Sequence, residues 1–185
     1  MKYHIEDIKS RIDEIFDEVV TFRRELHMYP ELSEQESETA ARIQSRLETL
    51  GIEFIPDVAG HGVVGTIYGK NKEKAVGIRA DIDALPITEQ TDFPYKSQVP
   101  GVMHACGHDI HTAILYGTAK ILSEIKDELP GSVKLFFQPS EETVGGAKQI
   151  FLTFAIGSVA RMMPDLSSSC MLSPTTRHLP IVAIS

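Results

Sequence analysis

Apolar residues recur at helical spacing through the first part of the chain. Over residues 5–28 they lie three, four or seven positions apart with charged residues between them, which predicts an amphipathic helix. Residues 33–50 repeat this pattern and predict a second helix. Ser33 and Glu36 have the spacing of a capping box at its start, and Gly51 is the residue type that ends helices.

The middle of the chain alternates between short apolar runs and one long helical stripe. Runs rich in Val and Ile, separated by Gly and polar turns, predict strands at residues 52–55, 63–68, 75–80 and 132–138. A further helix is predicted from about Asp109 to Asp127, and another after Gly145. Two opening helices followed by strands, a helix and a strand are typical of an α/β layered domain.

Residues 151–185 differ from the rest of the chain in charge and pattern. Their only charged residues are Arg161, Asp165 and Arg177, and they show no clear amphipathic period. The sequence therefore predicts one domain over residues 1–150 followed by a divergent tail.

Composition narrows the class of protein. The chain has 185 residues, 42% hydrophobic and 24% charged, which suits a globular domain with a sizeable core. Its net charge of −8 argues against a nucleic-acid or anionic-membrane partner. The first residues lack the apolar core of a signal peptide, and the longest apolar stretch, residues 151–160, is too short to cross a bilayer. A cytoplasmic protein is expected, in which a disulfide between Cys106 and Cys170 has weak support.

The densest group of chemically active side chains lies at residues 104–111, which hold three histidines, one cysteine and one aspartate. Thiolate, imidazole and carboxylate are the ligand classes that zinc accepts. Cys106 and His108 are two apart, so a turn directs both at one ion, and His111 lies one helical turn beyond His108. The alternative is a cysteine nucleophile paired with His108, which ranks lower because no oxyanion hole is evident.

Two pairs of carboxylates follow predicted strands. Asp81 and Asp83 point the same way in an extended chain, so one is suited to bind or bridge metal while the other orients a histidine. Glu141 and Glu142 are adjacent, so one can bind metal while its neighbour takes a proton from water. The alternatives are a solvated loop with an Asx turn for the first pair and a solvated acidic pair for the second.

Four segments together resemble the M20 metallopeptidase family, and most closely its amidohydrolases of N-acyl amino acids. They are residues 23–33 (RRELHMYPELS), 79–86 (RADIDALP), 102–109 (VMHACGHD) and 137–142 (FQPSEE). Their order and spacing match the family, and four matches are far more specific than one. The resemblance implies a zinc-aminopeptidase-like α/β/α layered domain with a mixed sheet, incomplete at its C-terminus.

The resemblance also implies a site and a reaction. By motif, Cys106, His108 and Glu142 resemble metal ligands, Glu141 the general base, and Asp83 the aspartate that orients a ligand. The family implies two divalent metal ions per site, zinc or manganese. The implied reaction is hydrolysis of the amide bond of a small N-acyl amino acid.

Beyond Gln149 the resemblance ends. The family's Gly-Leu-His ligand motif, two further histidine ligands and the lid domain that supports homodimers are not recognisable. Residues 1–150 are expected to be the N-terminal part of a metallohydrolase catalytic domain and residues 151–185 a divergent tail, as in a truncated or frameshifted product. The expected function is amide hydrolysis impaired by truncation. The alternative is an inactive fragment that serves as a weak metal-binding or interaction module.

Overall fold

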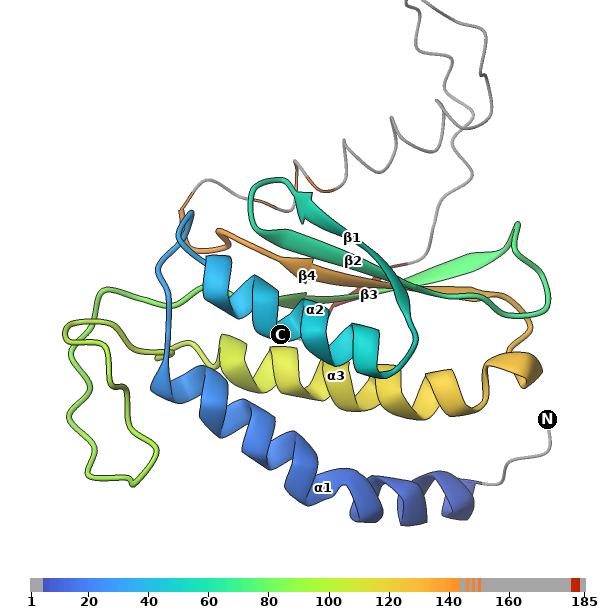
Figure 1. Cartoon of the computed structure of the whole chain (residues 1–185), viewed down its shortest axis with the longest axis horizontal. Coiled ribbons are helices and arrows are strands. Elements are labelled where there is room, and N and C mark those ends of the chain that lie inside the picture. Colours follow the sequence, from blue (N-terminus) through green and yellow to red (C-terminus); the bar gives the residue numbers. More distant parts are fainter. Residues whose placement is uncertain (1–4, 144–145, 147, 149, 151–180, 184–185) are drawn as a thin grey trace, which may run out of the picture.

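The fold is a mixed β-sheet with three long helices packed on one side (Figure 1). The computed structural model describes residues 5–143, 146, 148, 150 and 181–183. The helices are α1 (Ile5–Met28), α2 (Ser37–Thr49) and α3 (His108–Glu124), with a short 3-10 helix η1 (Lys126–Glu128). The strands are β1 (Glu53–Val58), β2 (Gly62–Ile67), β3 (Ala75–Asp81), β4 (Ser132–Gln138) and β5 (Ile181–Ala183).

The sheet is mixed, with spatial order β1-β2-β4-β3-β5. The β1–β2 and β2–β4 pairs are antiparallel, whereas β3 runs parallel to both β4 and β5. In the β3–β4 register Asp81 stands opposite Gln138, so these two strands end at the same edge of the sheet. This edge carries the candidate site.

Alternating residues of β2 and β4 belong to two hydrophobic cores, one on each side of the sheet. Val63 and Phe137 face the helices and join the main core with Phe22, whereas Val64 and Phe136 face the opposite side of the sheet. Ile150, from the helical residues after Gly146, packs on that opposite side. The α/β fold class with a mixed sheet is therefore confirmed.

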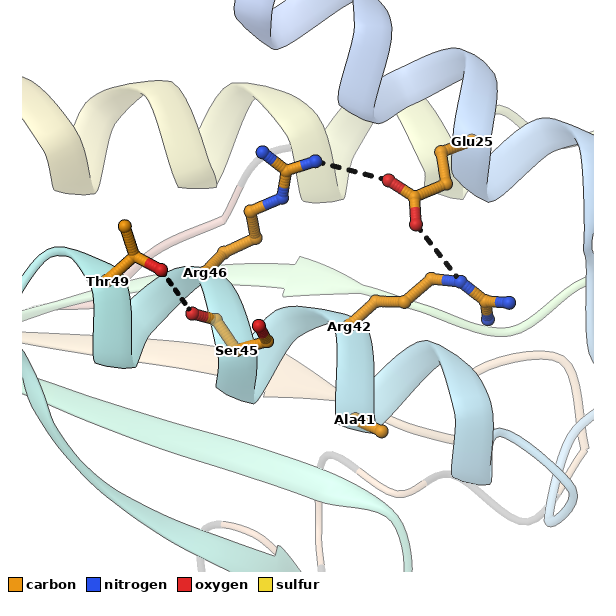
Figure 2. A pocket seen from close by; sticks show the side chains of 6 residues that line it. All are labelled: Glu25, Ala41, Arg42, Ser45, Arg46 and Thr49. Atoms are coloured by element: carbon orange, nitrogen blue, oxygen red, sulfur yellow. Dashed lines mark hydrogen bonds and ion pairs between the residues drawn. The ribbon is translucent and has the colours of Figure 1, made fainter.

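The helices form two tiers beneath the sheet (Figure 1). The second and third helices contact the strands, and α1 packs against α3. A methyl group added at Gly117 would lie 3.0 Å from Val19, so the glycine allows α1 to approach α3 closely. Between α1 and α2, Glu25 pairs with Arg42 and Arg46, and all three line a pocket that shares no residue with the candidate site (Figure 2).

The predicted capping box of the second helix is wrong. The helix begins at Ser37 rather than Ser33, and the side chain of Glu31 accepts hydrogen bonds from the backbone N–H groups of Glu38 and Thr39. The side chains of Ser33 and Glu36 instead form hydrogen bonds with Asp83 and Ser140 at the candidate site. The predicted end is confirmed, since Gly51 has a positive φ of 65° just beyond the helix.

The other predicted elements agree closely with the structure. The bounds of α1 and β4 match the predicted ranges, and the remaining predicted strands are shifted by one to three residues at their ends. The β5 strand was not predicted. The helix predicted after Gly145 lies mostly outside the described residues, as do Cys170 and most of the tail. None of the described helices is long and apolar enough to span a membrane.

Candidate metal centre

Three chain segments meet at the edge where β3 and β4 end. Asp81 is the last residue of β3, and α3 begins at His108 beside it. The turn after β4 brings Glu142 to the same edge, where its backbone N–H donates to the Asp83 carboxylate over 3.0 Å. Open α/β sheets usually place ligands at this edge. The fold therefore gathers the side chains that the sequence singled out.

Cys106, His108 and Glu142 form one group suited to a metal ion. Their ligand atoms lie within 4.8 Å of one another. His108 Nε2 is 3.8 Å from Glu142 Oε1, and two ligands of a tetrahedral zinc ion stand about 3.3–3.7 Å apart, given ligand distances of roughly 2.0–2.3 Å. The His108–Glu142 separation is therefore close to the one that zinc requires, and side-chain shifts of up to about 1 Å would bring all three ligand atoms to one divalent ion.

Asp83 holds His108 in the orientation that such an ion requires. His108 Nδ1 lies 3.1 Å from Asp83 Oδ1 and 3.0 Å from the Asp83 carbonyl oxygen. This nitrogen therefore carries the proton, which leaves Nε2 as the free lone pair. Ser33 Oγ donates to Asp83 Oδ2 over 2.7 Å, so a residue of the first motif supports the same carboxylate.

The charge state of Asp83 follows from these contacts. Burial raises the pKa of its carboxyl group, but hydrogen bonds from His108, the Glu142 N–H and Ser33 outweigh burial and lower the pKa to about 2. Asp83 is therefore ionised at neutral pH and stabilises the Nδ1–H form of His108.

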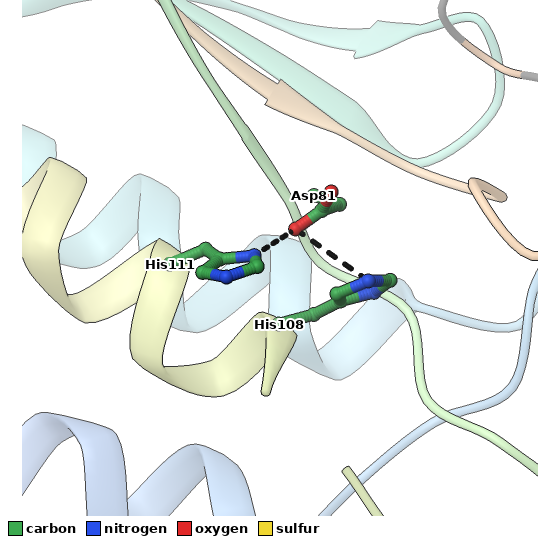
Figure 3. Close-up of side chains that lie close together, drawn as sticks. All are labelled: Asp81, His108 and His111. Atoms are coloured by element: carbon green, nitrogen blue, oxygen red, sulfur yellow. Dashed lines mark hydrogen bonds and ion pairs between the residues drawn. The ribbon is translucent and has the colours of Figure 1, made fainter. Parts of the chain in front are cut away.

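A second possible ligand group consists of Asp81, His108 and His111 (Figure 3). Asp81 Oδ1 lies 2.6 Å from His111 Nδ1 and 3.7 Å from His108 Nε2. Arg79 Nη1 also pairs with the other Asp81 oxygen at 3.1 Å. Because His108 has one free nitrogen, it serves one ion only, and Asp81 is already neutralised by Arg79. The group with Cys106 is therefore the better first metal position.

The Glu141–Glu142 turn is fixed by a buried carboxyl group that the sequence reasoning did not identify. Glu36 is fully buried, and its Oε1 accepts the Ser140 backbone N–H over 2.8 Å. Ser140 Oγ accepts the Glu34 N–H over 3.0 Å, and Ser140 itself has a positive φ of 53°. These bonds tie the turn after β4 to the segment before α2. The interpretation of Glu36 as a cap hid this contact.

Cys106 is exposed and is a poor candidate for a nucleophile. Its hydrogen bond with Glu142, together with partial burial, raises the pKa of the thiol to about 11. A nucleophilic cysteine needs a lowered pKa. A thiol beside a carboxylate and a histidine is instead suited to lose its proton when a metal ion binds.

His104 is the one histidine of the 104–111 segment that falls outside both groups. It is buried, and burial lowers the pKa of its imidazole to about 4, which keeps the ring neutral. Its ring lies 6.5 Å from that of His27 on α1. The dense segment therefore supplies side chains both to the metal groups and to the buried core beside them.

Comparison with known proteins agrees with this geometry. The model of Peptidase family M20/M25/M40 matches residues 77–175, more than half of the chain. The chain belongs to this family. The predicted family resemblance is thereby confirmed, and the matched region contains both ligand groups.

Two relatives of known sequence are similar to the chain over most of its length. The chain is 48% identical to N-acetyl-L-cysteine deacetylase of Bacillus subtilis over 72% of its length, which covers 32% of that protein. It is 46% identical to Thermostable carboxypeptidase 1 of Saccharolobus solfataricus over 97% of its length, which covers 47% of that protein.

A solved M20 structure has the same fold. The YXEP protein of Bacillus subtilis, a dinuclear metal-binding peptidase of the family, matches with a TM-score of 0.74 and 43% identity. The match covers 78% of this chain and 40% of that one. The chain thus spans less than half the length of each of these three proteins.

Proposed function

We propose that the chain is part of a metal-dependent amidohydrolase that cleaves the amide bond of small N-acyl amino acids. Cys106, His108 and Glu142 would hold a divalent ion, and Glu141 would be the general base. The observation that carries this proposal is the orientation of His108, whose Nδ1 is bonded to Asp83 while Nε2 faces the other two ligands.

The ligand set favours zinc over manganese. A thiolate is a soft ligand that suits zinc, whereas manganese suits sets made of carboxylates, carbonyls and water. A divalent ion held by Cys106, His108 and Glu142 would acidify water and polarise an amide carbonyl. The second ion that the family implies would need ligands beyond these three, and Asp81 and His111 of the second group are candidates.

Glu141 is suited to move the proton. It is exposed and lies next to Glu142 in the turn fixed by Ser140. Its carboxylate would accept a proton from the water that attacks the amide carbon. The same carboxyl group would then deliver that proton to the leaving nitrogen, which releases the free amino acid.

The same proposal covers the division of the chain into domains, its assembly and its location. We take residues 1–150 as the N-terminal part of the catalytic domain and residues 151–185 as a divergent tail, of which residues 181–183 add a strand to the sheet. Homodimerisation would require a lid domain. We predict a cytoplasmic location. A chain that binds metal without catalysis is the second candidate, because the preferred group supplies only three protein ligands and the chain spans less than half of its relatives' length.

The test combines metal analysis with hydrolysis of N-acetyl and N-benzoyl amino acids. For the full chain loaded with zinc we expect about one tightly bound ion and measurable hydrolysis. Glu141→Gln should retain the metal and lose about 10²–10⁴-fold in rate, the usual contribution of a general base. His108→Ala should lose the metal.

Three outcomes would contradict parts of the proposal. Equal metal loss in the Glu141 and His108 variants would refute the division of roles between them. Bound metal without hydrolysis would favour the non-catalytic candidate. Hydrolysis of C-terminal peptide bonds in preference to N-acyl amino acids would assign a carboxypeptidase specificity.

A further inference from the structure

A largely buried group of four charged residues lies behind the candidate metal centre, and the proposed function does not use it. It comprises Arg23 and His27 of α1, Asp109 of α3 and Glu89 of the loop between β3 and α3. We call these four residues the buried clamp. His27 is 3% exposed and Asp109 is 1% exposed, so water contributes little to their stabilisation. Charges at such burial persist only when they are paired.

His27 bridges two carboxylates. Its Nδ1 lies 2.7 Å from Asp109 Oδ2, and its Nε2 lies 3.3 Å from Glu89 Oε1. Because both partners only accept hydrogen bonds, both ring nitrogens must donate, which makes the ring an imidazolium. Arg23 Nη2 is 3.2 Å from Nδ1, but the shorter contact with Asp109 assigns the Nδ1 proton to that carboxylate.

The buried clamp balances its own charge. Arg23 Nε lies 2.8 Å from Asp109 Oδ2, so two cations face two carboxylates. Glu89 is in turn held by the Ser97 backbone N–H over 2.6 Å and by the hydroxyl of Thr91. The arrangement therefore joins the end of α1, the loop and the start of α3 in one unit.

The buried clamp acts on the metal turn through the chain itself. Asp109 directly follows His108, and Gly107, with a positive φ of 84°, separates His108 from Cys106. Asp83 holds the His108 ring, while the buried clamp holds the helical turn from which that ring projects. In the part of the chain that the structure describes, no hydrogen bond or ion pair links His27 to a proposed ligand.

We propose that His27 is a positioning residue which, through Asp109, fixes the Cys106–His108 turn in the geometry that binds metal. This inference rests on the proposed metal centre. It also gives a role to the Arg-Arg-Glu-Leu-His motif, which places Arg23 and His27 one helical turn apart on α1.

The test measures cobalt binding by the full chain. Cobalt bound to a thiolate gives a charge-transfer band, so its intensity reports the Cys106 contact and its titration gives the affinity. We expect His27→Ala to weaken cobalt binding by about 10–100-fold, the usual effect of removing a partner beyond the ligands. His27→Gln retains an N–H donor for Asp109 and should recover part of that loss.

Tyr116→Phe is the matched control. It removes another hydrogen bond between α3 and α1, the one from the Tyr116 hydroxyl to Glu18, two helical turns away from the metal turn. We expect its cobalt affinity and charge-transfer band to equal those of the wild type. Circular dichroism checks that each variant is folded, and His27→Gln serves as the test if His27→Ala does not fold.

The outcomes separate this inference from the proposed function. Wild-type cobalt affinity in folded His27 variants would overturn the positioning role while leaving the metal centre intact. Equal losses of cobalt affinity in the His27 and Tyr116 variants would show that both weaken the packing of α1 on α3 in general. That result would also overturn the positioning role of His27. A wild-type chain that binds no cobalt would overturn the proposed metal centre, and the positioning role with it.

Discussion

The two halves of α1 are joined to α3 by the same kind of contact in opposite surroundings. Near its start, Arg11 pairs with Glu124 at 2.6 Å, and the two side chains are 35% and 38% exposed. Near its end, Arg23 pairs with Asp109 at 2.8 Å, where the carboxylate is fully buried. One helix thus carries a solvated ion pair at one end and a desolvated ion pair at the other.

The difference in exposure between the two ion pairs shows at which end of α1 a charged pair affects stability. Water already stabilises both members of the exposed pair, so bringing them together contributes little. In the second pair the Asp109 carboxylate has no such alternative and depends on its partners, whereas the Arg23 side chain is 24% exposed. The buried end is also the end beside the proposed metal ligands, so its charges are coupled to the site as well as to stability.

The largest expected effect comes from removing the buried carboxylate. Asp109→Ala would leave Glu89 as the one carboxylate of the buried clamp facing Arg23 and His27, so we expect it to lower the free energy of unfolding by about 3–5 kcal/mol. The measurement is urea unfolding with a chelator present, so that metal binding does not add to stability. A loss below about 1 kcal/mol would show that the buried clamp is not the anchor that its burial suggests.

A smaller effect, with a characteristic pH dependence, is expected from His27→Gln. The hydrogen bond to Asp109 raises the pKa of His27, so its stabilisation is fully present below the unfolded pKa of about 6.5 and is lost as pH rises through the higher folded value. The pKa of Asp109 is lowered, although burial opposes this, because the bond from His27 and the nearby positive charges outweigh burial. Its contribution is therefore lost in acid, below the unfolded value of about 3.9.

The free energy of unfolding of the wild type should thus exceed that of His27→Gln by about 1.5–3 kcal/mol between roughly pH 4 and pH 6.5, where the difference is largest. The titratable and charged groups around His27 are Arg23 from its own helix, Asp109 from α3, and Glu89, Tyr95 and His104 from the loop. Buried neutral His104 destabilises both proteins as pH falls, so the difference between them reports chiefly the contacts of His27. A difference that grew from pH 6 to pH 9 would contradict the imidazolium assignment.

Local pattern predicted most of the fold. The helical period of α1 and the apolar run of β4 gave correct bounds because both signals depend on neighbouring residues. The three-residue β5 strand carries no such signal, since it forms by pairing with β3 about a hundred residues earlier. The capping box failed because Ser33 bonds to Asp83 and Glu36 to Ser140, both distant in sequence.

At the candidate site, too, local sequence signals were recognised and contacts between distant residues were not. Cys106 and His108 were found from their spacing, and the structure brings Glu142 beside them. The roles of Glu36 and His27 were missed because their partners, Ser140 and Asp109, lie 104 and 82 residues away. Residues that offer ligands are recognised by type and spacing, whereas residues that position them are recognised only by contact.

The smallest expected effect sharpens the comparison between the two ends of α1. Glu124→Ala removes a carboxylate from Arg11 just as Asp109→Ala removes one from Arg23, yet it should cost less than about 1 kcal/mol because the pair is exposed. Raising the ionic strength from 0.1 M to 1 M shortens the Debye length from about 10 Å to about 3 Å. The effect of Glu124→Ala should then vanish from urea unfolding, while that of Asp109→Ala should stay nearly unchanged because salt does not enter a buried pair. Equal salt sensitivity at the two ends would mean that Asp109 is solvated, and both the buried clamp and its hold on the metal turn would have to be abandoned.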